Sequence, residues 1–262
     1  MVRRIIIFTV LVGLTSCSRF VSIQRNPDAD VRYNAAMDYY DESDFYRAGL
    51  LFEELIPTLI GSAKAEKVQF YYAYCQFNQQ QYQLSAHYFK SFYDTYRRSD
   101  RAEEAIYMHA YSMYLGTPQY NLDQSGTDKA ISALQDVINL YPSGEFAEKA
   151  FTYIQKLRAR LEQKSFDLAK QYLTLGRYKA AVVALDNFRK DFPDSQMREE
   201  AGYKRLEAQY ELAKISIQSL KQERYQQLVD DYLIFVERYD KSEYIKKAEA
   251  LYVAAQGELE KM

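Results

Sequence analysis

The feature that most constrains this chain is one apolar pattern that returns five times, at intervals of 37 to 51 residues. In its clearest copy, Ala181, Leu185 and Phe188 lie at i, i+4 and i+7, which places them on one face of a helix. Gly176 separates this helix from an earlier one. The other copies keep the spacing at Ala48/Phe52/Leu55, Ser85/Phe89/Phe92, Ala130/Leu134/Val137 and Leu228/Tyr232/Phe235. We therefore predict five packed helical hairpins.

The clearest copy resembles the second half of a tetratricopeptide repeat. It has the spacing G-x-Y-x-x-A-x-x-x-L-x-x-F-x-x-x-x-P at Gly176, Tyr178, Ala181, Leu185, Phe188 and Pro193. The other copies depart from it, since Ser43, Gln80 and Arg224 stand in place of the turn glycine. The resemblance implies an all-α, right-handed solenoid of about five hairpins. Ser242–Glu260 is predicted to be its capping helix.

The first sixteen residues have the pattern of an export signal. Arg3 and Arg4 precede an apolar run at Ile5–Leu14, which is too short to span a membrane as a helix. The ending Leu-Thr-Ser-Cys resembles a bacterial lipobox, which implies that Cys17 is lipid-modified. Ser18 follows it and favours the outer membrane. The alternative is an ordinary secretory peptide with an incidental cysteine.

The rest of the chain is predicted to have three parts. Residues 17–30 contain Pro27 and no sustained period, which is typical of a flexible tether, about 40 Å long when extended. Residues 31–142 hold repeats 1–3, and residues 143–262 hold repeats 4–5 and the capping helix. Two departures are predicted within them: a long loop at Gly116–Thr127 and an extended first helix in repeat 5 at Ala208–Arg224. The loop is either functional or a tolerated surface insertion.

Little in the sequence points to catalysis. His87 and His109 stand alone, and no nucleophile motif or metal-ligand spacing accompanies them. We therefore expect no enzyme activity, cofactor or metal. A net charge of −2 does not favour nucleic acid. Cys75 would lack a disulfide partner if Cys17 is acylated, and is expected to be a buried packing residue.

Tyrosine is abundant: the chain has 26 tyrosines and no tryptophan. Tyr107, Tyr111 and Tyr114 share one helix face, and so do Tyr71 and Tyr74. Both groups lie on first helices of hairpins, which line the concave surface of such a solenoid. Rigid rings with hydroxyl groups suit the binding of a peptide segment, and the alternative is ordinary packing between helices.

Two arginines form a second candidate partner site. Arg158 and Arg160 stand in the run Leu-Arg-Ala-Arg-Leu. Residues two apart on a helix point in different directions, so the two cannot both face inward. A solvated face is the alternative to a partner contact.

The lipobox, the short tether and the five hairpins together resemble the BamD family of outer-membrane lipoproteins. The likeness is strongest at Ala102–Leu115 and Leu157–Pro193. It implies a non-enzymatic scaffold of β-barrel assembly, held by its lipid at the periplasmic face of the outer membrane. It also implies that Leu157–Glu260 binds the periplasmic domains of a BamA-like barrel protein. Unfolded outer-membrane proteins would bind Val31–Leu115.

Two other functions fit the same sequence. One is a periplasmic repeat adaptor for envelope division or polysaccharide export, which would have other partners. The second is a glycan-binding lipoprotein of nutrient uptake, although sugar platforms usually employ the tryptophan that this chain lacks.

Overall fold

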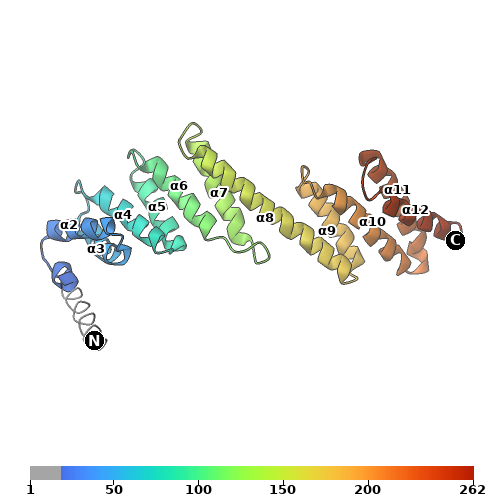
Figure 1. The fold of residues 1–262 in the computed structure, drawn as a ribbon, viewed down its shortest axis with the longest axis horizontal. Helices are drawn as coiled ribbons and strands as arrows, with labels where there is room; N and C mark the ends of the chain where they lie inside the picture. The colour runs from blue at the N-terminus through green and yellow to red at the C-terminus, as the bar shows by residue number, and fades with distance from the viewer. Residues whose placement is uncertain (1–18) are drawn as a thin grey trace, which may run out of the picture. The chain divides into compact units, whose positions relative to one another are not determined.

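The computed structural model describes residues 19–262, so the predicted leader and Cys17 lie outside the described residues. The described part contains helices and no strand, which confirms the all-α prediction (Figure 1). A short helical segment at residues 19–24 comes first. The helices that follow are α2 (Ala29–Asp41), α3 (Phe45–Thr58), α4 (Ala65–Asn78), α5 (Tyr82–Thr95), α6 (Ala102–Leu115), α7 (Ser125–Leu140), α8 (Ala147–Thr174), α9 (Tyr178–Asp191), α10 (Arg198–Lys214), α11 (Gln218–Arg238) and α12 (Ile245–Leu259).

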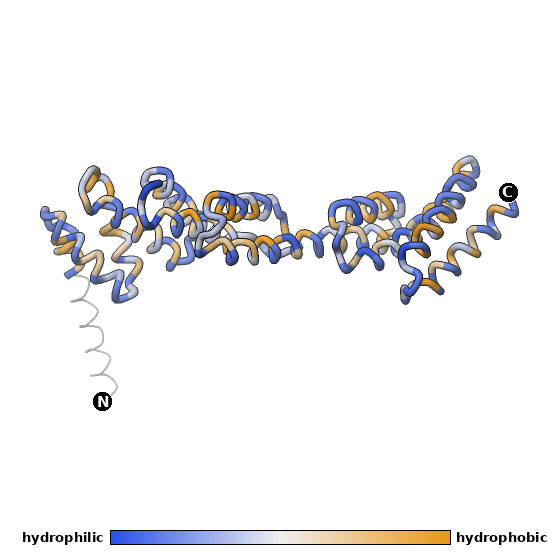
Figure 2. The backbone as a smooth tube through the Cα atoms, turned by 90° about the horizontal axis from the view of Figure 1, so that it is seen from above, coloured by the Kyte–Doolittle hydropathy of each residue, from blue (hydrophilic) through white to orange (hydrophobic). Residues whose placement is uncertain are grey.

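Helices that are neighbours in sequence pack as hairpins. The pairs are α2 with α3, α4 with α5, α6 with α7 and α10 with α11, and α12 covers α10 and α11. The end of α8 packs on α9, where the Phe166 and Phe188 rings lie 5.2 Å apart. Apolar and polar stretches alternate along the helices (Figure 2). The residues of the fivefold pattern are buried on the second helices, except for the half-buried Tyr232.

The chain divides into two compact units, Met1–Leu157 and Arg158–Met262. The division lies inside α8, fifteen residues beyond the expected boundary at residues 142 and 143. The reason is that α8 serves two cores. Ile154 and Leu157 join the core of the first unit, whereas Phe166 and Ala169 join a core of the second.

Three hairpin turns share one backbone conformation although only one contains glycine. Gly176 has a φ of +68°, and Ser43 and Gln80 have φ values of +63° and +60°. Each of these residues lies two positions before the first residue of the second helix of its hairpin. The left-handed conformation costs a residue with a Cβ about 1–2 kcal/mol, so the packing of the hairpins overrides the local preference at Ser43 and Gln80. Arg224 is different, because it lies inside α11.

The predicted tether at residues 17–30 is wrong for most of its length. Residues 19–24 are helical, and Phe20 is only 9% exposed within the core of the first hairpins. The Phe20 ring meets Tyr39 edge to face at 5.8 Å, and the Arg47 guanidinium lies 5.9 Å from its centre. One aromatic contact and one cation thus hold a segment that lacks a long hydrophobic period.

Of the two predicted irregularities, one is present and one is absent. The α6–α7 loop runs over residues 116–124, and the buried Gln124 amide donates to the Gln119 and Leu122 carbonyl oxygens at 2.7 and 3.1 Å. The prediction that the first helix of the fifth hairpin extends to Arg224 is wrong, because α10 ends at Lys214 and α11 begins at Gln218. The charged residues up to Arg224 therefore lengthen the second helix.

A buried arginine joins three helices of the second unit. Arg205 on α10 donates to the carboxylates of Asp186 on α9 and Asp231 on α11. The side chains of Arg205 and Asp231 are 11% and 12% exposed, while Asp186 is 45% exposed. The guanidinium fork can serve two carboxylates at once, which a lysine cannot do with the same geometry. The pattern of apolar residues gave no sign of this network.

Candidate functional site

The first helices of three hairpins in the first unit bring aromatic rings into one continuous surface. We name the aromatic surface by its members, which are Tyr74, Phe77, Tyr107, Tyr111, Tyr114, Phe146 and Tyr153. At its centre the α6 rings are stacked: Tyr107 on Tyr111 at 5.8 Å and 4°, and Tyr111 on Tyr114 at 6.0 Å and 13°. The i, i+4, i+7 spacing predicted from the sequence produces this ladder.

Two rings at the start of α8 complete one side of the aromatic surface. Phe146 stacks on Tyr107 at 4.3 Å, and Tyr153 lies 5.0 Å from Tyr111 and 4.4 Å from Tyr114. Neither ring was predicted from the sequence. Their spacing of seven residues is that of one helix face, and it was the available signal.

The other side of the aromatic surface comes from α4. The Phe77 ring lies 5.9 Å from Tyr111, and Tyr74 meets Phe89 edge to face at 4.9 Å. The Tyr74 hydroxyl donates to a carboxylate oxygen of Glu104 on α6. This bond fixes the α4 ring against the α6 ladder.

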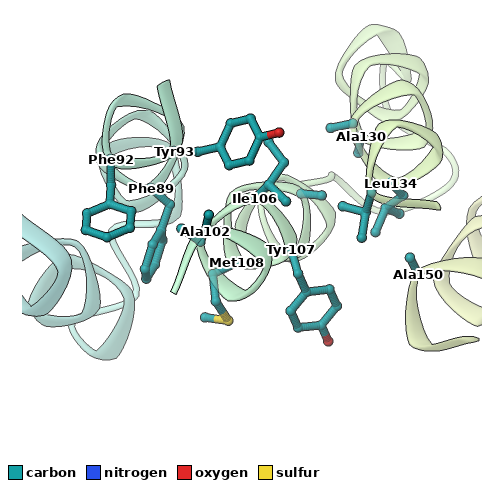
Figure 3. Packing of buried hydrophobic residues seen from close by; sticks show 14 of the residues in the cluster. Phe89, Phe92, Tyr93, Ala102, Ile106, Tyr107, Met108, Ala130, Leu134 and Ala150 are labelled. Carbon is teal, nitrogen blue, oxygen red and sulfur yellow. The ribbon is translucent and has the colours of Figure 1, made fainter. Parts of the chain in front are cut away.

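The members of the surface differ in what they can touch. Tyr107 is 6% exposed, and its ring leaves α6 on the side opposite Tyr93 (Figure 3). It is therefore a buried support for the surface. Tyr74, Tyr111, Tyr114 and Tyr153 are half-buried, so each retains part of a ring edge for a ligand.

Three tyrosines of the surface, Tyr74, Tyr107 and Tyr111, have hydroxyl groups with raised pKa values. Burial raises the pKa of Tyr111 to about 12, and a hydrogen bond with Tyr153 adds to the effect. Burial also raises the pKa values of Tyr107 and of Tyr74, where the bond to Glu104 contributes further. Two exposed cations flank these rings: the Lys156 ammonium lies 5.2 Å from the Tyr153 ring centre, and the Lys149 ammonium 4.9 Å from that of Phe146. The surface can thus offer rings, donors and positive charge together.

Tyr71, the remaining predicted tyrosine, belongs to the core of the first two hairpins. Its ring lies 4.8 Å from Tyr40 and is stacked on Phe52 at 6.2 Å. It is half-buried and adjoins Phe70 at 6.0 Å. It therefore supports α4 from the side of the first hairpin.

The two predicted arginines lie in the second unit. Arg158 is exposed, and Arg160 is partly buried and takes part in an interaction. Their different exposure agrees with the argument that they cannot both face inward.

Among residues 19–262, no group of three or more histidine, cysteine or acidic side chains could hold a metal ion. No helix among these residues is long and apolar enough to cross a membrane. Cys75 is completely buried and free, as predicted, and burial raises the pKa of its thiol to about 12.

A family model described as "YfiO: Outer membrane lipoprotein" matches residues 25–224. The chain belongs to the YfiO family of outer membrane lipoproteins. Among YfiO-like relatives, the outer membrane protein assembly factor BamD of Caulobacter vibrioides is 31% identical over 91 residues, which cover 35% of this chain and 30% of the relative. The outer membrane protein assembly factor BamD of Pasteurella multocida is 19% identical over 199 residues, which cover 72% of this chain and 76% of the relative.

One solved structure also aligns with this chain. The TPR2AB-domain:pHSP90-complex of yeast Sti1 aligns with a TM-score of 0.39 and 14% identity, and the alignment covers 87% of this chain and 98% of the other.

Proposed function

We propose that this protein is a non-enzymatic scaffold of outer-membrane β-barrel assembly, whose first unit binds unfolded barrel proteins on the aromatic surface. The observation that carries the proposal is the aromatic surface itself, found in a member of an outer membrane lipoprotein family. Relatives from two bacteria bear the name of an outer membrane protein assembly factor, which supports the same function.

The aromatic surface suits a segment of an unfolded barrel protein. Such a segment alternates apolar and polar side chains and has unpaired backbone groups. Half-buried rings such as those of Tyr111 and Tyr114 offer apolar edges to the apolar side chains. A tyrosine hydroxyl can also form a hydrogen bond with a backbone group. Lys156 adds attraction for a carboxylate, whereas Lys149 is paired with Glu145 at 3.5 Å. Because much of each ring is already buried, the remaining contact is small, and the complex should dissociate readily.

The lipid anchor is part of the proposal. If Cys17 is acylated, three residue steps separate it from the buried Phe20, a distance of at most about 11 Å. The first hairpin then lies next to the membrane surface, and a 40 Å tether does not hold it away. Confinement to the inner leaflet raises the effective concentration of the scaffold around other membrane-bound assembly components.

The second unit is proposed to contact the assembly partner. By the likeness to the BamD family, Leu157–Glu260 binds the periplasmic domains of a BamA-like barrel protein. The exposed Arg158 at the start of this unit is available for such a contact.

Photocrosslinking in outer membranes tests the assignment of the first unit. A photoreactive phenylalanine analogue is placed at Tyr114 or at Tyr153 on the aromatic surface. The matched control is Phe151 on α8, which is 55% exposed and is not a member of the surface. We expect unfolded barrel proteins to crosslink from Tyr114 and Tyr153 and much less from Phe151.

A photoreactive residue in the second unit tests the assembly partner. The analogue at Arg158 should crosslink a large barrel protein with periplasmic domains. Equal yields of barrel substrates from Phe151 and Tyr114 would refute the role of the aromatic surface. Recovery of division or export proteins in place of barrel proteins would overturn the function and leave the fold intact.

A further inference from the structure

The second unit contains an open apolar groove of about 750 Å³, formed by the end of α8, one face of α9 and the end of α10. Its walls include Leu168 on α8, Val183 on α9 and Ile215 just after α10. These side chains are 43%, 52% and 66% exposed. Leu175 directly precedes Gly176 of the groove wall, and Ile217 lies two residues after Ile215. Leu175 and Ile217 are 63% and 68% exposed. So many large apolar groups within one short region indicate an interaction surface.

The charge around the groove has one sign. Arg177 and Lys179 are the charged residues that line it, and both are exposed. Neither forms an ion pair with any residue among 19–262 within 4.0 Å, whereas some other cations of the unit do: Lys170 pairs with Asp167, Lys214 with Glu211 and Arg189 with Asp186. Two unpaired cations beside apolar walls favour an occupant that carries negative charge at the edge of an apolar face.

The walls of the groove favour a helical occupant. They are helices and their turns, which offer no free sheet edge. An extended segment would find no strand to pair with on these walls, so its backbone groups would have only side chains as partners. A helix satisfies its own backbone and presents apolar side chains at i, i+4 and i+7.

We propose that this groove binds an acidic amphipathic helix of a partner protein, with its apolar stripe on Val183 and Ile215 and its acidic flank on Arg177 and Lys179. The proposal deepens the proposed function and rests on it only in assigning a protein partner to the second unit. It does not involve the aromatic surface or any barrel substrate.

Binding of designed peptides to the full chain tests the groove. The probe is a fluorescein-labelled helical peptide of about four turns, with leucines at i, i+4, i+7 and i+11 and glutamates on both flanks. A counterpart carries lysines in place of the glutamates. Measured by fluorescence anisotropy, the acidic peptide should bind saturably and at least about tenfold more tightly than its counterpart at low salt.

Substitutions locate the binding. Val183→Asp and Ile215→Asp should each weaken the acidic peptide about tenfold or more. The matched control is Leu233→Asp on α11, which replaces a leucine that is 56% exposed and lies outside the groove. The double variant Arg177→Glu/Lys179→Glu should reverse the preference toward the lysine peptide, and Lys190→Glu, at an exposed position on α9, should leave it unchanged.

Several outcomes would overturn the proposal. These are no saturable binding of the acidic peptide, equal affinity for the two peptides, or equal weakening by Leu233→Asp. A concentration-dependent dimer in sedimentation that Val183→Asp abolishes would show that a second copy fills the groove, which also refutes the proposal. Because the peptides test the second unit alone, failure here leaves the crosslinks from Tyr114 unaffected. Failure of those crosslinks likewise leaves peptide binding unaffected.

Discussion

Replacing Arg205 with methionine should selectively destabilise the second unit. Methionine keeps much of the aliphatic bulk but removes the guanidinium that α9, α10 and α11 share. Asp231, which is 12% exposed, then loses its charged partner and keeps a hydrogen bond from Gln227 at 3.1 Å. The negative charge remains where water can hardly reach it.

The magnitude follows from the exposure of the two carboxylates. Removing one partner of a buried ion pair costs about 3–5 kcal/mol, and Asp231 approaches that case. Asp186 is 45% exposed and can hydrate again, so its share is below about 1 kcal/mol. Since Gln227 still donates a hydrogen bond to Asp231, the lower end of the range of about 3–5 kcal/mol applies. We therefore expect the free energy of unfolding of the second unit to fall by about 3 kcal/mol.

Hydrogen exchange resolved by peptide is the appropriate assay, because the two units need not unfold together. A loss of about 3 kcal/mol lowers the protection of α10 amides about a hundredfold, at 1.4 kcal/mol per factor of ten. Protection of α4 and α6 in the first unit should not change. The double variant Arg205→Met/Asp231→Leu removes the stranded charge and should recover most of the loss.

Two results would refute this account. One is a loss of less than about tenfold in α10 protection, which would mean that Asp231 is easily hydrated. The other is a double variant that is no more stable than Arg205→Met, which would assign the loss to packing around the guanidinium.

Three further predictions concern single residues. Gln80→Gly should stabilise the first unit by about 0.5–1 kcal/mol because it removes a left-handed residue with a Cβ, and Gly176→Ala should destabilise the second unit by a similar amount, both measured by urea unfolding. Burial lowers the pKa of His109, whose Nδ1 lies 2.7 Å from the Ala86 carbonyl oxygen. The unfolded chain therefore takes up a proton first, so stability should fall as pH drops below about 6.5, and His109→Gln should reduce that loss in urea unfolding at two pH values. Cys75, with its pKa raised to about 12 by burial, should resist a maleimide in the native protein and react in urea.

Much of the fold follows from short-range pattern. The i, i+4, i+7 triplets predicted the buried faces of the second helices, and Phe45, Tyr82 and Tyr178 mark the first residues of three of them. Periodicity predicts helices well because one turn of helix reports directly on one face. It failed at Phe20, where one aromatic contact and one cation replace a sustained period.

The candidate site was only partly predictable. The stripe of Tyr107, Tyr111 and Tyr114 is a property of one helix, so spacing alone indicated it. Phe146 and Tyr153 join that stripe from a different helix, across a connection that sequence spacing does not measure. That Tyr107 is buried also depends on Phe146, which covers it.

What this sequence determined by itself is therefore the set of helices and the face that each one buries, since these depend on residues within about two turns of one another. Only the tertiary structure decided which rings meet across hairpins, which cations remain unpaired beside the groove, and that Arg205 joins two aspartates 19 and 26 residues away in sequence. The physical reason is that such contacts depend on the angle and distance between packed helices. These are set by the combined volume of many side chains and leave no periodic trace in the chain.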